Sequence, residues 1–246
     1  MRDEGSGTAI SRMFDRVARR YDLANRVMSL GLDIRWRKAL ARRLKIIDQP
    51  GRLLDLAAGT GDQIVAAKRI HPSLAADGLD LSPAMVALAE PKWTGLAPPR
   101  PEMVIGSALS LPYPEGVFDS VSISFGLRNI PDRAGVYAQV RRVLKPGGRF
   151  LVLEAFHDRQ SLWAPVTGFY LKRVMPALGG RLVSRERAAY DYLADSVLAF
   201  PRPEALGAEL AGAGFGRIAF RVYAFSTVML VWGDKPADGQ PGAGQI

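Results

Sequence analysis

The chain of 246 residues contains no cysteine and only two histidines. The absence of cysteine excludes disulfide scaffolds, thiolate zinc sites, iron–sulfur clusters and thiol nucleophiles. Two histidines also disfavour a histidine-rich metal site, so we expect no metal. No apolar run reaches the roughly 18 residues that a membrane-spanning helix needs, and no signal peptide opens the chain. We therefore expect a cytoplasmic protein.

What the chain does contain is ordinary for a folded protein, with 48% hydrophobic and 23% charged residues. Its length suits one globular domain. The net charge is +9, and it is unevenly spread: +6 in residues 1–50 and +4 in 157–190, against +1 in 51–156 and −2 in 191–246. This surplus favours a polyanionic partner, either a nucleic acid or an anionic membrane surface.

The apolar periodicity predicts two kinds of segment in the first two thirds of the chain. Residues 11–47 show the i, i+3, i+4, i+7 spacing of helices and are expected to form an N-terminal helical lid. Residues 51–156 alternate short apolar strands with helices, which is typical of βαβ units in a parallel sheet. We predict five strands in this core, at 52–56, 75–80, 102–105, 117–125 and 149–156.

A helical insertion, residues 158–199, interrupts this alternation. A closing helix and a pair of strands follow in residues 203–232, and the two strands are expected to form a hairpin. The prediction is a single doubly wound α/β domain over residues 1–232, with a seven-stranded, mostly parallel sheet. The tail, residues 233–246, is rich in Gly, Pro, Asp and Gln and is predicted to be disordered.

The turn after the first predicted strand carries the clearest ligand motif. It reads Asp-Leu-Ala-Ala-Gly-Thr-Gly-Asp over residues 55–62, but Ile64 replaces the third glycine of a dinucleotide fingerprint. An acid in the first helical turn would also repel a pyrophosphate. The loop therefore favours S-adenosylmethionine, which carries a sulfonium and an ammonium group, over NAD. The predicted cofactor contacts are Asp55, Gly59, Thr60, Gly61 and Asp62.

Further cofactor contacts are expected at the ends of the next strands. Asp80 ends the second predicted strand, where a carboxylate can accept hydrogen bonds from both ribose hydroxyls of an adenosine. Ser107 and Ala108 follow the third strand, and Ser124 lies at the end of the fourth. The alternative is that Asp80 is a helix N-cap and Ser107 an ordinary loop hydroxyl.

Two segments carry a more specific pattern. Residues 14–29 read Phe-Asp-Arg-Val-Ala-Arg-Arg-Tyr-Asp-Leu-Ala-Asn-Arg-Val-Met-Ser, and residues 124–129 read Ser-Phe-Gly-Leu-Arg-Asn. Both resemble signatures of the ubiquinone/menaquinone biosynthesis C-methyltransferase family. The resemblance extends over about residues 11–232 and implies a Rossmann-like class I S-adenosylmethionine-dependent methyltransferase fold. Further matches are residues 142–149, 153–154 and 190–196.

Members of that family methylate a ring carbon of a prenylated quinol. The resemblance implies demethylmenaquinol as the acceptor, with the benzoquinol precursor of ubiquinone or another lipophilic aromatic molecule as alternatives. Residues 155–157 read Ala-Phe-His where the family has Phe-Ser, and the final strand pair departs from the family pattern over residues 223–232. The resemblance also implies that the cofactor is lined by Thr60, Asp80, Ser107, Ala108 and Ser124.

Methylation of a ring carbon requires an aligned donor and an acceptor hydroxyl that has lost its proton. Arg128 can stabilise the resulting phenolate and Asn129 can orient a hydroxyl. Alternatively, Arg128 pairs with a loop acid and Asn129 shapes a turn. Tyr21 is a candidate hydrogen-bonding or stacking partner on the lid, or else a core residue. His157 follows the fifth strand and is the candidate general base.

Residues 162–178 combine apolar and aromatic side chains with Lys172 and Arg173. This pattern suits an interfacial segment that accepts an isoprenoid tail, or else a helix pair packed on the sheet. The two basic segments would frame the acceptor mouth, which favours transient contact with an anionic membrane from its inner face. A nucleic-acid partner becomes a remote alternative because no RNA-binding module is recognisable. A homo-oligomer is left open.

Overall fold

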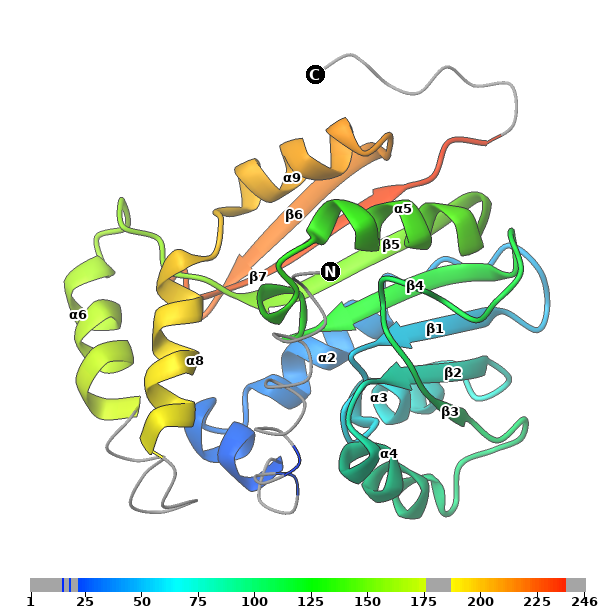
Figure 1. Cartoon of the computed structure of the whole chain (residues 1–246), viewed down its shortest axis with the longest axis horizontal. Helices are drawn as coiled ribbons and strands as arrows, with labels where there is room; N and C mark the ends of the chain where they lie inside the picture. Colours follow the sequence, from blue (N-terminus) through cyan, green and yellow to red (C-terminus); the bar gives the residue numbers. More distant parts are fainter. Residues whose placement is uncertain (1–14, 16–17, 19–21, 176–186, 238–246) are drawn as a thin grey trace.

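A seven-stranded sheet forms the centre of the computed structural model, which describes residues 15, 18, 22–175 and 187–237 (Figure 1). Its strand order is β3-β2-β1-β4-β5-β7-β6, and β7 runs in the opposite direction to the other six strands. The expected mostly parallel sheet with a closing hairpin is therefore confirmed. The strands are β1 (Arg52–Leu56), β2 (Ala75–Asp80), β3 (Glu102–Ile105), β4 (Phe118–Ser124), β5 (Leu144–Ala155), β6 (Gly216–Tyr223) and β7 (Val228–Asp234).

Helices cover both faces of the sheet, and α6 and α8 of the insertion stand beyond the carboxyl ends of the parallel strands (Figure 1). Residues 22–28 are also helical. Among the described residues, no helix is both long and apolar enough to cross a bilayer. The helices are α2 (Asp33–Ala41), α3 (Asp62–Ile70), α4 (Pro83–Ala89), α5 (Arg133–Val143), α6 (Ala164–Phe169), α8 (Arg187–Ala199) and α9 (Pro203–Gly212), with the short turns η1 (Glu90–Trp93), η2 (Leu127–Asn129) and η3 (Tyr170–Val174).

The side chains of each strand alternate between the two faces of the sheet. In β1, Leu53 packs against Ala41 of α2 and Ile64 of α3. Leu54 and Leu56 point to the other face and join the core under α5 and α9. All seven residues of β4 are buried, as expected for a central parallel strand that is covered on both sides. The strands predicted at 52–56 and 117–125 therefore form part of the central, buried sheet.

The fifth strand begins earlier than the sequence predicts. Leu144 pairs with Phe118, and the register then shifts so that Arg149 pairs with Ser120. The Lys-Pro-Gly-Gly segment, residues 145–148, therefore forms a bulge within β5 rather than a turn before it. A bulge accommodates extra residues without breaking the pairing on either side.

The closing strand also runs further than predicted. Asp234 pairs with Arg149 and Gly233 pairs with Phe150, so these two residues of the expected disordered tail belong to β7. The Arg149 guanidinium holds Asp234 with an Nε–Oδ1 distance of 2.7 Å. The prediction of disorder was wrong at these two positions and at Lys235, whose backbone hydrogen-bonds to Gly147 and Gly148. Residues 238–246 lie outside the described residues.

Candidate active site

The strand order reverses between β1 and β4, so the chain leaves these neighbouring strands in opposite directions. Their carboxyl ends therefore border a crevice, which is where doubly wound sheets bind ligands. Ala57 and Phe125, just beyond the two strand ends, have φ angles of 47° and 60°. Such left-handed backbone is uncommon for residues with a Cβ and concentrates at functional sites. A Cβ on Gly126 would lie 2.6 Å from that of Ala57, so only glycine lets the loops touch.

The loop after β1 is held in place by the acid that ends β2. Asp80 accepts hydrogen bonds from the backbone N–H groups of Gly59 (2.8 Å) and Ser82 (2.9 Å). Burial raises the pKa of Asp80, although these N–H groups act against the shift. Gly61 has a φ of 77°, and a Cβ there would lie 3.3 Å from Nε1 of Trp93. The loop therefore follows a tight path whose left-handed turn at Gly61 favours glycine.

The polar side chains of this loop bind the cationic side chains of other residues. Lys92 places its Nζ 2.6 Å from Thr60 Oγ1 and 2.6 Å from Asp62 Oδ1. Arg26 binds the other oxygen of Asp62 at 3.0 Å. Burial acts to raise the pKa of Asp62, but Arg37 and these two cations outweigh it and lower the pKa. Asp62, which was expected to attract a cationic ligand, therefore binds cationic side chains of the protein itself.

These features fit S-adenosylmethionine. The loop after β1, the acid at the end of β2 and the carboxylate of Asp62, which binds cationic side chains, occur together at the carboxyl ends of these strands. The indole N–H of Trp93 is buried beside Gly61 and has no hydrogen-bond partner, so an unused donor also faces this region. Unpaired buried donors are costly and commonly mark ligand sites.

The N-terminal segment contacts both sides of the crevice. Asp22 accepts a hydrogen bond from the Thr60 hydroxyl (2.7 Å), and Asp15 accepts one from the Ser82 hydroxyl. At the other end, the Met28 carbonyl accepts a hydrogen bond from the Tyr170 hydroxyl in η3 (2.8 Å). The described part of this segment thus runs from the loop after β1, which is the proposed cofactor loop, to the insertion. Its role as a lid stays a prediction, and Tyr21 lies outside the described residues.

A buried ion pair joins the ends of β4 and β5. Glu154, which is fully buried, accepts a hydrogen bond from Arg128 Nη1 at 2.5 Å. The same Nη1 donates to the Phe125 carbonyl at 2.7 Å. Arg128 Nε is buried and has no partner. The structure therefore contains the alternative in which Arg128 pairs with an acid, but this acid, Glu154, lies in strand β5 and not in a loop. Among the described residues, Nε of the guanidinium has no partner.

The insertion supplies a residue that sequence reasoning did not single out. The Tyr192 hydroxyl of α8 donates to the Asn129 side chain at 3.3 Å, so Asn129 is held by α8 and does more than shape a turn. Burial raises the pKa of Tyr192, while Arg128 acts in the opposite direction. Tyr192 lies in the 190–196 segment that resembles the family signature, and this match was the available signal for it.

The remaining predicted cofactor residues have ordinary local roles as well. Ser124 donates to the buried Gln63 side chain at 3.3 Å. The Ser107 hydroxyl accepts a hydrogen bond from the backbone N–H of Leu109 at 3.2 Å, which is the loop role of the alternative reading. Ala108 is buried in the core beneath α5. These contacts leave the predicted cofactor roles of the three residues untested.

His157 lies in a different neighbourhood. Its Nδ1 is 3.3 Å from the Thr167 hydroxyl of α6. Burial and the nearby Arg159 lower its pKa. It lines a hollow of about 460 Å³ formed with α6, η3 and α8. In the part of the chain that the structure describes, no hydrogen bond joins His157 to Arg128 or Asn129.

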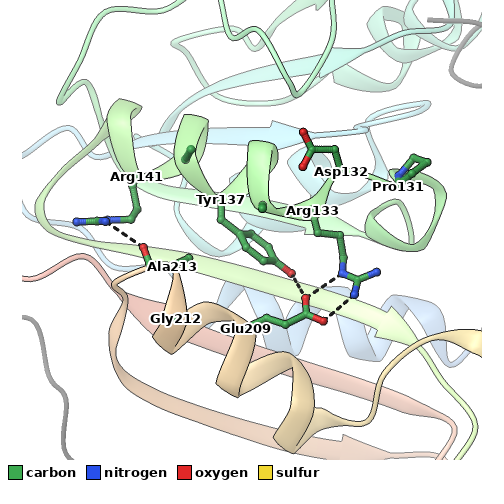
Figure 2. A pocket seen from close by; sticks show the side chains of 10 residues that line it. Pro131, Asp132, Arg133, Tyr137, Arg141, Glu209, Gly212 and Ala213 are labelled. Atoms are coloured by element: carbon green, nitrogen blue, oxygen red, sulfur yellow. Dashed lines mark hydrogen bonds and ion pairs between the residues drawn. The ribbon is translucent and has the colours of Figure 1, made fainter. Parts of the chain in front are cut away.

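A second hollow, of about 660 Å³, lies between α5 and α9 (Figure 2). Figure 2 shows that Arg133 and Tyr137 of α5 point toward Glu209 of α9. Arg133 binds Glu209 through two hydrogen bonds of 2.9 and 2.6 Å, and Tyr137 donates to the same carboxylate at 2.9 Å. This network holds the two helices together on the sheet.

Comparison with known proteins decides the class. The chain matches the model of the ubiE/COQ5 methyltransferase family over residues 2–235. It belongs to this family. It is similar to the demethylmenaquinone methyltransferase of Thermus thermophilus, with 42% identity over 226 residues that cover 91% of this chain and 100% of that protein. The ubiquinone/menaquinone biosynthesis C-methyltransferase UbiE of Geobacter sulfurreducens is 40% identical over 231 residues, covering 93% and 89%.

A solved structure agrees in fold. The S-adenosylmethionine-dependent methyltransferase of Thermotoga maritima, described as a possible histamine N-methyltransferase, has a TM-score of 0.63 and covers 91% of this chain and 98% of its own. At 17% identity, this likeness concerns the fold alone. The family and the fold together confirm the class I prediction. This ubiE/COQ5 family member is an S-adenosylmethionine-dependent methyltransferase of quinone biosynthesis.

Asp55 provides a pH-dependent test of the site's electrostatics. It is buried in β1 and accepts a hydrogen bond from Ser122 at 2.6 Å. Burial raises its pKa to about 7, against the opposing effects of Ser122 and Arg37, and Asp80 raises it further. At neutral pH this carboxyl therefore titrates, unlike an exposed aspartate with a pKa of about 3.9.

We expect Asp55→Asn to change how stability depends on pH. Because the folded pKa is raised, the unfolded chain loses its proton first, and the wild-type protein should lose stability as the pH rises from about 4 to about 7. The variant cannot ionise, so its free energy of unfolding relative to wild type should increase over this window by up to about 4 kcal/mol. Urea unfolding at several pH values measures this. Parallel curves would contradict the raised pKa.

Proposed function

We propose that this methyltransferase transfers a methyl group to a ring carbon of demethylmenaquinol and so produces menaquinol. The observation that carries the proposal is the match to the demethylmenaquinone methyltransferase of Thermus thermophilus, which extends over that protein's whole length. The benzoquinol precursor of ubiquinone is the second candidate acceptor, because the Geobacter sulfurreducens relative is named for both quinones.

We assign donor binding to the carboxyl ends of β1 and β2. S-adenosylmethionine supplies a methyl group on a sulfonium, which is an electrophilic carbon. Asp80 is partly buried and fixed by two backbone N–H groups, which supports its role as acceptor for the ribose hydroxyls. Asp62 binds the cationic side chains of Lys92 and Arg26, which supports a role for this carboxylate, and for the neighbouring Thr60, beside the cationic end of the donor. The proposed cofactor set is Asp55, Gly59, Thr60, Gly61, Asp62, Asp80, Ser107, Ala108 and Ser124.

We assign acceptor activation to the ends of β4 and β5. A quinol ring carbon becomes nucleophilic when the adjacent hydroxyl is deprotonated, and a fixed guanidinium stabilises that phenolate. Glu154 and the Phe125 carbonyl hold Arg128 through Nη1, and its Nε is left for the phenolate oxygen. Asn129, oriented by Tyr192, can position the hydroxyl. The proposed roles of Tyr21 on the lid and of His157 as base rest on their sequence positions alone.

The acceptor also defines where the enzyme works. A prenylated quinol resides in the bilayer, so a protein that methylates it must collect it there. We propose a cytoplasmic enzyme that makes transient contact with the inner face of an anionic membrane. The positive charge concentrated in residues 1–50 and 157–190 supports this assignment.

The direct test is methyl transfer from labelled S-adenosylmethionine to demethylmenaquinone reduced to its quinol. Mass spectrometry should find the product heavier by one labelled methyl group, with the label on the ring. The benzoquinol precursor of ubiquinone, offered in a parallel reaction, should be methylated more slowly. If neither quinol acquires label while the donor binds, the proposed acceptor class is wrong.

Asp80→Asn should weaken donor binding about tenfold, because a hydrogen bond to a charged acceptor contributes more than one to a neutral amide. Isothermal titration calorimetry with S-adenosylmethionine measures the effect. Asp77→Asn is the matched control on the same strand, since Asp77 pairs with Arg52 at 3.3 Å. Equal affinities for the two variants would exclude Asp80 from the donor site.

Arg128→Gln should lower kcat about 100-fold, the loss expected when one donor to a developing oxyanion is removed, with little change in donor affinity. This variant leaves Glu154 buried without its partner, so the double variant Arg128→Gln/Glu154→Gln is the control. We expect the double variant to regain thermal stability and not turnover. Recovery of turnover in the double variant would assign the pair a structural role only.

A further inference from the structure

A basic hollow lies within the insertion, and neither Arg128 nor Asn129 lines it. It is the hollow of about 460 Å³ lined by His157 and by three cations, Arg159, Lys172 and Arg173. Within the described part of the chain, none of the three cations forms an ion pair or a side-chain hydrogen bond. The nearest acid in the sequence, Asp158, is engaged by Arg202 at 3.5 Å. The hollow therefore offers unneutralised positive charge in a concave site.

An apolar rim borders this hollow. Phe169 and Pro165 line the hollow, and Phe169 is itself 64% exposed. Large apolar side chains exposed on one surface are uncommon in monomeric proteins and indicate an interaction site. The rim consists of Leu162, Trp163, Val166 and Phe169 from the α6 region, exposed by 98, 49, 61 and 64%, and Phe225, exposed by 66%.

The turn between β6 and β7 contributes Phe225 to the rim. Its ring centroid lies 4.8 Å from that of Trp163, so two distant parts of the chain form one continuous surface. Ala224, Phe225 and Ser226 have φ angles of 51°, 55° and 64°, which is a strained path for three residues with a Cβ. Thr227 holds the turn by donating its side chain to the Ala224 carbonyl at 2.7 Å. The fold thus holds a large aromatic side chain in solvent at a conformational cost.

The rim and the hollow adjoin the proposed acceptor site. On the inner side of η3, Leu171 and Met175 are buried against Met28 and Ala155. Ala155 directly follows Glu154, the partner of Arg128. A lipid that approaches over the rim therefore reaches the ends of the strands where the quinol head would react.

We propose that the basic hollow and the apolar rim dock the enzyme on an anionic bilayer, with the hollow binding the phosphate of an acidic phospholipid headgroup. Aromatic side chains enter the interfacial region of a bilayer, and basic residues beside them bind anionic headgroups. Among the described residues, no acid forms an ion pair with the cations of this hollow, whereas in the α5–α9 hollow Arg133 pairs with Glu209. The inference rests on the proposed function in one respect, that the acceptor is a bilayer lipid.

Vesicle flotation tests the charge contribution. The wild-type protein should bind vesicles of phosphatidylcholine with added phosphatidylglycerol, and binding should weaken as salt rises. Lys172→Gln/Arg173→Gln should bind about 30-fold more weakly, since each basic residue beside an anionic surface contributes about fivefold. The control Arg69→Gln/Arg100→Gln removes the same charge at the opposite edge of the sheet and should bind nearly as wild type. Equal losses in the two double variants would overturn the proposal.

Trp163 allows a second measurement that does not depend on weakened binding. Its fluorescence should shift to shorter wavelength and be quenched by brominated lipid when vesicles are added. Trp163→Phe keeps an aromatic ring and should still bind, but it should lack this change in fluorescence. If the quenching persists in that variant, other tryptophans contact the membrane and the assigned surface is wrong. Trp163→Ala/Phe225→Ala should weaken binding to vesicles with and without phosphatidylglycerol.

Two acceptors separate this proposal from the proposed function. With a short-tailed, water-soluble quinol, Lys172→Gln/Arg173→Gln should methylate at the wild-type rate, whereas a quinol embedded in anionic vesicles should be methylated much more slowly. Vesicle binding with no methylation of any quinol would overturn the proposed acceptor and leave the docking surface intact. A wild-type dimer in solution that Phe225→Ala dissociates would identify the rim as a protein interface and overturn the docking surface.

Discussion

The reversal of strand order between β1 and β4 is the constraint on which the site depends. Because the chain leaves these two strands toward opposite faces, their loops must separate, and the crevice between them is a consequence of the topology. The close approach of Gly126 to Ala57 and the left-handed backbone at Ala57 and Phe125 show how tightly the two loops are packed before they part. Asp80 and Arg128 then attach the neighbouring strand ends to this crevice.

Electrostatics divides the molecule into two parts. At the cofactor loop, cations and acids neutralise one another, with Lys92 and Arg26 both held by Asp62. At the insertion, Lys172 and Arg173 line a hollow with no ion-paired acid among the described residues. The net charge of +9 for the whole chain therefore does not show that charges are paired in one region and unpaired in the other. Paired charges organise a binding loop, and unpaired ones attract an external anion.

The segments outside the sheet connect these two regions. The N-terminal segment binds Thr60 through Asp22 and binds η3 through the Met28 carbonyl. Tyr192 of α8 reaches Asn129 beyond β4. The insertion is thus tied to both the donor side and the acceptor side of the crevice. The shared contacts explain why a surface suited to a membrane and a site suited to a quinol lie next to each other.

The sequence by itself determined the elements whose signals are local. The bounds of β1, β2 and β3 agree with prediction because each strand is a short apolar run ended by a turn or an acid. The cofactor loop was readable for the same reason, since its glycines and acids are consecutive. Only the tertiary structure decided which side chains meet across the chain: Arg128 with Glu154, Tyr192 with Asn129, and Phe225 with Trp163. Residues distant in sequence become partners through the fold, and the hydrophobic periodicity of the sequence does not predict such contacts.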